Sequence, residues 1–445
     1  MTTAISPSRA GLVFLAGVLL VLGGCAEKEL ILPGEREEIR ADFAGEYTSP
    51  KARDNISRPI RLPAQQSNAE WAQSPGTEAN RVAHPALRAT PQRVWSTPIG
   101  AGDGRKVRIT AAPVVGGGRI YTLDSGARVS GVSPSGALLW SVDLTPPRDN
   151  EGEATGGGLA YAGGTLYVSL GFGALVALDA ASGAVRWRQD LNSTGSGTPL
   201  VRDGLVYVVA GDDTGWAVEA DTGRIAWQVQ GTPSITNVLG APAPVLAKGL
   251  VVFAFGSGDL VAAFRRGGLR RWDASVAGQR KGRAVANISD ITGSPVVVGD
   301  RIYVGNFSGR IVALSAQNGE RLWTARQGAT GPVWPAGGSL FVLTDLNQLA
   351  RLDARDGSLI WAVDLPGFVK DKPRKRGRVF AHYGPVLAGG RVIVASNDGL
   401  IRFFAPEDGR LISTLDVPGG ATTSPVVAGG TLYVVGANGE LHAFR

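Results

Sequence analysis

From residue 91 onward, short apolar runs rich in Val, Ile and Tyr alternate with turns rich in Gly, Asp and Asn. One copy of this pattern extends from Gly293 to Trp323 and holds four such runs, each a few residues long. The residue types between the runs are those that close tight β-hairpins. The pattern therefore predicts a repeated unit of four antiparallel strands joined as a meander.

Two kinds of marker allow the repeats to be counted: an outer motif, Gly-x-x-x-Trp, and an inner marker, the start of the first strand of each repeat. A seventh copy of the outer marker keeps its glycine but has Ser413 in place of Trp, and a Trp-bearing run at 93–96 stands alone before the first copy. The complete outer markers, Gly-x-x-x-Trp, are Gly136/Trp140, Gly183/Trp187, Gly223/Trp227, Gly268/Trp272, Gly319/Trp323 and Gly357/Trp361. The inner markers are strands that start near Pro113, Leu159, Pro199, Pro244, Pro295, Pro332, Pro385 and Pro425.

The two ends of this series complement each other. The last repeat, 424–445, has three runs, and the run at 93–96 supplies a fourth. Pairing the two would close a ring and remove the exposed sheet edges on which antiparallel repeats aggregate. An open solenoid would need capping repeats, and the sequence shows none. The sequence therefore predicts an all-β fold over residues 91–445, an eight-bladed β-propeller of four-stranded antiparallel blades, closed by an N-terminal strand that completes the last blade.

The N-terminus has the features of an export signal. Residues 11–22 are an apolar run preceded by Arg9, and the run is too short to span a membrane as a helix, which takes about 20 residues. Leu22-Gly-Gly-Cys25 follows, and it resembles a bacterial lipobox. The resemblance implies a signal peptide at 1–24 and acylation, for instance with palmitate, at Cys25. The alternative is a plain signal peptide with an incidental cysteine. Ala26 instead of Asp implies an anchor in the outer membrane, facing the periplasm.

Residues 26–90 differ from both neighbouring segments. They contain charge clusters such as Glu35–Glu38, prolines and polar residues, without an alternating apolar pattern. We expect residues 25–90 to be a lipidated cysteine followed by a flexible tether, with one short helix near 35–43.

Composition excludes several other classes of protein. An apolar content of 44% is too high for a disordered chain. One cysteine cannot form an internal disulfide or a cysteine zinc site, and three widely spaced histidines offer little for a metal centre. Asp179, Glu219 and Asp353 each precede a repeat glycine by four positions, so they are expected to brace hairpins and not to bind metal. The repeated Trp residues are expected to pack between blades; stacking on sugars is the alternative.

A family resemblance follows from the repeat motif. Ala-Leu-Asp-x-x-Ser-Gly-x-x-x-Trp at 177–187 resembles the pyrroloquinoline-quinone-type propeller repeat. Together with the lipobox, the tether and the absence of other domains, it resembles the BamB family of lipoproteins. The resemblance implies a non-enzymatic scaffold without cofactor or metal. Such a scaffold would dock the periplasmic POTRA domains of a BamA-like barrel subunit, with other lipoproteins of the complex, and aid folding and insertion of outer-membrane proteins.

Two local matches imply where that docking would occur. The segments at 233–235 and 288–291 resemble family loops that dock POTRA domains. By position, Ile235 would be an apolar anchor and Asp290 a polar one. Asn237 and Thr292 differ from the better-known family pattern, which implies re-tuned docking chemistry. Ordinary inter-blade connections are the alternative interpretation.

Two rival functions make different demands on the sequence. A quinoprotein-type periplasmic dehydrogenase would need Ca²⁺ held by hard oxygen ligands and a carboxylate base, and no acidic cluster has ligand spacing. Its relatives usually carry a vicinal disulfide, which a single cysteine forbids. A glycan- or peptidoglycan-binding propeller would need exposed aromatic rings in the central funnel. We therefore expect no enzymatic activity.

Two connections between blades are strongly basic, within a net charge of +7. A periplasmic protein rarely meets nucleic acid, so none is expected as a partner; an acidic protein or an anionic lipid fits such a face better. The residues are Arg280, Lys281 and Arg283 between the fourth and fifth blades, and Lys372, Arg374, Lys375 and Arg376 between the sixth and seventh.

Overall fold

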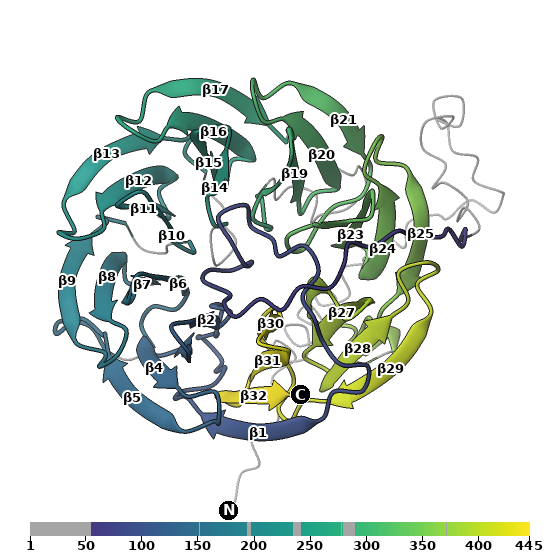
Figure 1. The fold of residues 1–445 in the computed structure, drawn as a ribbon, viewed down its shortest axis with the longest axis horizontal. Coiled ribbons are helices and arrows are strands. Elements are labelled where there is room, and N and C mark those ends of the chain that lie inside the picture. The colour runs from purple at the N-terminus through teal and green to yellow at the C-terminus, as the bar shows by residue number, and fades with distance from the viewer. Residues whose placement is uncertain are drawn as a thin grey trace, which may run out of the picture. The chain divides into compact units, whose positions relative to one another are not determined.

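The computed structural model describes residues 55–150, 152–193, 197–234, 242–276, 278, 290–370 and 372–445. In this part of the chain, eight four-stranded antiparallel sheets are arranged as the blades of a ring (Figure 1). The predicted eight-bladed β-propeller is confirmed.

Blades 1 to 4 follow one another in chain order, each from an inner strand to an outer strand at the rim (Figure 1). Blade 1 contains β2 (Val114–Gly116), β3 (Arg119–Leu123), β4 (Arg128–Val132) and β5 (Leu138–Asp143); blade 2 contains β6 (Gly157–Ala162), β7 (Thr165–Leu170), β8 (Ala174–Asp179) and β9 (Val185–Asp190); blade 3 contains β10 (Leu200–Arg202), β11 (Leu205–Val209), β12 (Thr214–Glu219) and β13 (Ile225–Gln230); blade 4 contains β14 (Val245–Ala247), β15 (Leu250–Ala254), β16 (Asp259–Phe264) and β17 (Arg270–Ser275).

Blades 5 to 8 complete the ring, and the last takes its outer strand from the other end of the series. Blade 5 contains β18 (Val296–Val298), β19 (Arg301–Asn306), β20 (Arg310–Ser315) and β21 (Arg321–Ala325); blade 6 contains β22 (Trp334–Ala336), β23 (Ser339–Leu343), β24 (Gln348–Asp353) and β25 (Leu359–Asp364); blade 7 contains β26 (His382–Ala388), β27 (Arg391–Ser396), β28 (Leu400–Phe404) and β29 (Leu411–Asp416); blade 8 contains β30 (Val426–Ala428), β31 (Thr431–Gly436), β32 (Glu440–Phe444) and β1 (Arg93–Pro98).

The ring closes as the sequence predicts. β1 pairs antiparallel with β32, with Trp95 opposite Ala443 and Pro98 opposite Glu440. Beyond the strands, the amide of Gln92 donates to the carbonyl of Arg445 at 2.8 Å, and the reverse bond is 2.9 Å. The closing blade therefore has four paired strands, like the other seven.

The repeated tryptophans pack between adjacent blades, as expected. Each indole covers the marker glycine of the following blade, where a Cβ atom would lie only 2.6–2.8 Å from the ring. Trp187, for example, lies against Gly223, and its Nε1 donates to the carbonyl of Ala220 at 2.8 Å. Glycine is required there because it leaves room for the indole and because its φ is positive, +74° in Gly223. The pairs are Trp95/Gly136, Trp140/Gly183, Trp187/Gly223, Trp227/Gly268, Trp272/Gly319, Trp323/Gly357 and Trp361/Gly409.

The missing tryptophan at Ser413 has a geometric cause. Ser413 lies in β29, the outer strand of blade 7, whose neighbour is blade 8. In blade 8 the third and outer strands, β32 and β1, belong to opposite ends of the propeller sequence, so no hairpin turn with a marker glycine joins them. An indole at position 413 would have no glycine to cover.

The acidic residues before the marker glycines brace their hairpins. Asp179 accepts hydrogen bonds from the amides of Ala181 and Ser182 and pairs with Arg186 at 2.7 Å, and these contacts lower its pKa to about 2. Asp353 similarly accepts from Arg355 and from Arg58. The expected structural role of these carboxylates is confirmed for both.

The meander gives the ring two distinct faces. Turns from first to second strand and from third to outer strand lie on one side, which we call the hairpin face. Turns from second to third strand and the links between blades lie on the other side, which we call the connection face. All candidate docking loops belong to the connection face.

Residues 55–92, which we call the strap, differ from the expected flexible tether. The strap crosses the centre of the ring (the purple trace in Figure 1). Its backbone exchanges two bonds of 2.8 and 2.9 Å between Trp71 and Val115, and Asn68 and Pro85 accept from turn amides of the hairpin face. Across its length it hydrogen-bonds to every blade, through Val115, Tyr161, Arg202, Leu246, Val297, Ala362, Gly389 and Gly429.

One residue of the strap is buried against the start of two inner strands. Asn80 has no exposed surface, and its amide nitrogen donates to the carbonyls of Ala243, Pro244 and Pro295 at 2.9–3.3 Å. These carbonyls precede the inner strands of blades 4 and 5. The strap is thus part of the folded body, joined to it by isolated residues that leave no periodic pattern. The short helix expected at 35–43 and the signal peptide lie outside the described residues.

Candidate partner-docking face

The two loops singled out by the sequence link neighbouring blades on the connection face. The first runs from β13 to β14 and the second from β17 to β18. Ile235 and Asn237 lie in the first loop and outside the described residues, as do Arg280, Lys281 and Arg283 in the second; Cys25 is also outside them. Both ends of each loop are described, and they show how the loops are held.

Asp213 anchors the start of the first loop. It lies in the turn between β11 and β12 with φ +59° and is 2% exposed. One carboxylate oxygen accepts from the amide of Ser234 at 2.8 Å, and the other accepts from Gly256 at 2.8 Å. Burial raises the pKa of Asp213, and the two amide bonds only partly offset this. At the far end of the loop, the amide of Ala243 donates to the Ser294 hydroxyl at 3.0 Å.

Asn306 anchors the start of the second loop. This residue ends β19, has no exposed surface, and donates to the carbonyls of Val276 at 3.0 Å and Gly278 at 3.3 Å. The Ser308 hydroxyl adds a bond of 2.9 Å to Gly278. Neither Asp213 nor Asn306 stands out in the sequence, because each resembles the other polar turn residues of the repeat.

Asp290 and Thr292 lie at the base of the second loop. Asp290 is 4% exposed and its carbonyl accepts from the amide of Phe307 at 3.1 Å, while the Thr292 hydroxyl donates to Ala329 at 2.6 Å. Ile291, between them, is fully buried. The end of the loop is therefore fixed to blades 5 and 6, and these two residues hold it there.

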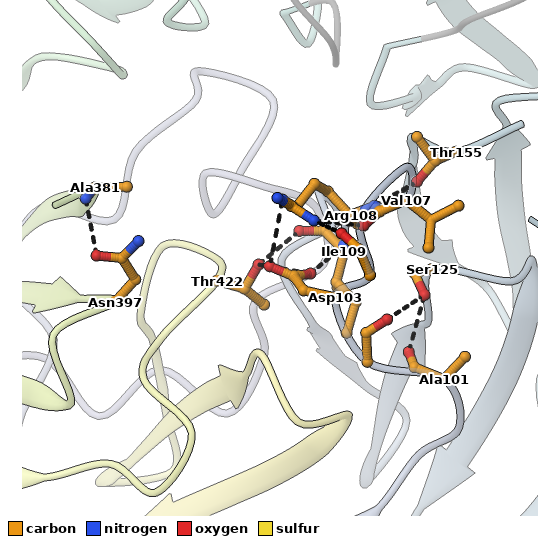
Figure 2. Close-up of polar contacts among 12 residues, drawn as sticks. Ala101, Asp103, Val107, Arg108, Ile109, Ser125, Thr155, Ala381, Asn397 and Thr422 are labelled. Atoms are coloured by element: carbon orange, nitrogen blue, oxygen red, sulfur yellow. Dashed lines mark hydrogen bonds and ion pairs between the residues drawn. The ribbon is translucent and has the colours of Figure 1, made fainter. Parts of the chain in front are cut away.

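A polar network also fixes the link from blade 8 to blade 1 (Figure 2). Asp103 accepts from the Thr422 hydroxyl at 3.1 Å and from the amide of Ile109 at 2.8 Å. The backbone amide of Arg108 donates to the Thr155 hydroxyl at 3.0 Å, and that hydroxyl donates to the Arg108 carbonyl at 2.6 Å. Nearby, Asn397 accepts from the amide of Ala381 at 2.9 Å. These bonds join blades 1, 2, 7 and 8, so the connection face is a braced surface on the closing side of the ring too.

The basic link between blades 6 and 7 is a hairpin, which we call the basic arm, residues 366–381. Phe368 bridges Val379, and the amide of Val369 donates to Arg378 at 3.0 Å. A short 3₁₀ helix, η3 (Pro373–Lys375), forms its tip. The predicted basic residues of this arm, Lys372, Arg374, Lys375 and Arg376, are all exposed.

Within the described residues, no group of three or more His, Cys, Asp or Glu side chains is placed to hold a metal ion. No helix in that part of the chain has the length and apolar character needed to cross a membrane. The indoles of the strap and of the inner strands are buried, with Trp71 and Trp334 each 1% exposed, so they offer no free face for a sugar ring.

Known proteins share this architecture. The family model described as outer membrane protein assembly factor BamB matches residues 125–363 and 347–445. The curated protein of that name from Bordetella pertussis is 28% identical over 359 residues, which cover 79% of this chain and 86% of that protein. The one from Escherichia coli strain K12 is 23% identical over 359 residues, covering 80% and 88%.

Solved structures agree on the fold. The crystal structure of BamB from Moraxella catarrhalis matches with a TM-score of 0.65 and 20% identity, covering 80% of this chain and 100% of that one. A europium-containing methanol dehydrogenase matches with a TM-score of 0.62 and 14% identity, which shows only that the propeller fold is shared. Because the family model spans most of the propeller, this chain belongs to the BamB family of outer membrane protein assembly factors.

Proposed function

We propose that this chain is a scaffold subunit of the machinery that assembles outer-membrane β-barrel proteins. It is held at the periplasmic face of the outer membrane by an acylated Cys25 and docks the POTRA domains of a BamA-like barrel subunit, alongside other lipoproteins of the complex. Through that docking it aids folding and insertion of outer-membrane proteins. Family membership supports the assembly role, and the chain is not an enzyme, because the family consists of assembly factors.

One structural observation supports the connection face as the docking surface. The strap covers the centre of the hairpin face, whereas the two candidate loops leave the connection face with their ends fixed by buried side chains. Asp213 fixes the first loop and Asn306 the second. A loop whose ends are already fixed loses less conformational entropy when a partner binds, which favours docking at this face.

The candidate residues divide into two roles. Ile235 and Asn237 contact the partner, as an apolar anchor with a polar neighbour. Asp290 and Thr292 position the second loop, because their side chains are buried or bonded at its base. A few residues commonly dominate such an interface, so loss of the apolar anchor is expected to have a large effect.

The docking proposal is tested with a double variant, Ile235→Ala with Asn237→Ala. We expect affinity pull-down from outer membranes to lose the barrel subunit, with the thermal unfolding midpoint unchanged. Ile225→Ala is a matched control, because Ile225 is 46% exposed on the outer strand of blade 3, away from the loops. Wild-type recovery of the barrel subunit by the double variant would refute the proposal.

The anchor is tested separately with Cys25→Ser. This variant is expected to remain unacylated and to leave the outer-membrane fraction or keep its signal peptide. Fatty-acid labelling of the variant would contradict the lipid-anchor assignment.

A further inference from the structure

The basic arm carries most of the net charge of the protein. Residues 370–378 contain six Lys or Arg residues and one Asp, a balance of 6 − 1 = +5, against +7 for the whole chain. The described cations of this stretch are exposed, and the hairpin bonds between Val369 and Arg378 and between Gly367 and Phe380 project them together. So dense a positive charge on one hairpin can attract an anionic surface.

Exposed apolar side chains accompany these cations. Phe368 is 42% exposed, Val369 45% and Val379 60%, and all three lie on the stem of the arm. The Arg376 guanidinium lies 4.9 Å from the centre of the Phe368 ring. Apolar groups bordered by Lys and Arg suit the boundary between lipid headgroups and acyl chains, where apolar parts enter and cations meet phosphates.

The arm leaves the propeller where the N-terminal segment arrives. Asn55 exchanges two side-chain bonds of 2.9 Å with the backbone of Ala362, in β25, and the amide of Ile56 donates to the carbonyl of Ile360 at 3.1 Å. The basic arm begins at residue 366, directly after β25 ends at Asp364. The chain that comes from Cys25 therefore joins the body on the strand from which the arm extends.

We propose that the basic arm is a second membrane contact, which binds the headgroups of anionic phospholipids. The proposal rests on the anchoring part of the proposed function, because a lipid on Cys25 would hold the chain at the membrane that the arm binds. A protein with an acyl anchor binds a membrane more stably when it also carries a polybasic patch, because the acyl chain and the basic residues each add to its membrane affinity. An acidic protein would match the cations, but the exposed apolar stem favours a lipid surface.

The test uses the unacylated chain from Ala26 to Arg445 and vesicles of phosphatidylcholine with and without phosphatidylglycerol. We expect binding only to the vesicles that contain phosphatidylglycerol, and weaker binding as salt is raised. The triple variant Arg374→Gln, Lys375→Gln, Arg376→Gln should reduce partitioning by roughly fivefold per cation, or about a hundredfold in all. The variant Phe368→Ser with Val379→Ser should also bind more weakly.

A matched control removes the same charge elsewhere. Arg105, Lys106 and Arg148 are exposed in the two links that flank blade 1 and do not belong to the arm, so their triple substitution by Gln should keep wild-type vesicle binding. Thermal unfolding of every variant checks its fold. The Ile235→Ala, Asn237→Ala variant should bind vesicles normally. A loss of lipid binding by the arm can therefore be distinguished from a loss of docking to the barrel subunit. The proposal is overturned if the wild type ignores anionic vesicles, if the arm variants bind them normally, or if those variants lose only the barrel subunit.

Discussion

The indole rings of Trp71 and Trp334 stack with their centroids 6.1 Å apart and their planes 16° from parallel. Trp71 belongs to the strap and is bonded by its backbone to blade 1, whereas Trp334 belongs to the inner strand of blade 6. The stack therefore joins two blades that are not neighbours, through a segment that precedes the propeller sequence. Folding of the ring and docking of the strap should be one cooperative event.

Asn80 offers a sharp test of that cooperativity. Its amide group faces three carbonyl oxygens, so Asn80→Asp replaces a donor with an acceptor or a buried charge. We expect the free energy of unfolding to fall by about 3–5 kcal/mol, the usual cost of an uncompensated buried charge. Urea denaturation followed by circular dichroism measures it. Asn318→Asp is the control, because Asn318 only accepts a bond, from the amide of Glu320, and should leave stability unchanged. Equal stability of both variants would mean that the strap is not part of the cooperative unit.

The inter-blade packing can be tested by a pair of glycines with nearly the same backbone conformation. Gly183 has φ +77° and a Cβ there would lie 2.6 Å from the Trp140 ring, whereas Gly204 has φ +75° and no atom within 4 Å. Both Ala variants bear the strain of a positive φ, about 1–2 kcal/mol. Gly183→Ala should lose a further 1–3 kcal/mol or so, since it must also displace the indole. Comparable unfolding midpoints in the two variants would contradict the role assigned to the Trp/Gly pairs.

The sequence predicts the repeating part of this molecule well, for a physical reason. Strands, turns and Trp/Gly pairs recur from blade to blade, so the blade number and the closing strand can be counted from the residues alone. The strap cannot be found this way, because Asn68, Trp71 and Asn80 each make a separate contact and follow no period. Asp213 and Asn306 cannot be identified from the sequence for the opposite reason, because they fit the repeat and resemble its other polar turn residues. Only the fold shows that each of them holds a loop of the candidate docking face.

Acid should destabilise the propeller through two histidines, the buried His442 and the half-buried His382. Burial lowers the pKa of His382 and of His442 below the usual value of about 6.5, against the opposing influence of Asp398 and Glu440 respectively. The unfolded chain then binds more protons than the folded one, so the contribution of these groups is fully present above pH 6.5 or so and is lost as the pH falls. In His382, Nε2 donates to the Pro366 carbonyl at 3.0 Å; this bond raises the pKa, and burial outweighs it.

Unfolding midpoints between pH 5 and pH 8 or so measure this effect. The double variant His382→Gln, His442→Gln should show a flatter decline on the acid side than the wild type. A decline of the same steepness in both proteins would assign acid sensitivity to other groups.

Asp213 links fold stability to the proposed docking. Asp213→Asn keeps one carbonyl oxygen but loses the second acceptor, so the amide of Ser234 or of Gly256 is left without its partner. An unsatisfied buried donor costs about 1–3 kcal/mol, and here that cost should loosen the loop that holds Ile235. Hydrogen exchange at these two amides should quicken, and association with the barrel subunit's periplasmic domains should weaken even though the contact residues are intact.

Asp212→Asn is the matched control in the same turn, because Asp212 accepts from the amide of Thr214 through one oxygen, which an Asn can supply. If exchange quickens in Asp213→Asn while association stays at the wild-type level, the first loop does not need to be pre-organised to dock its partner.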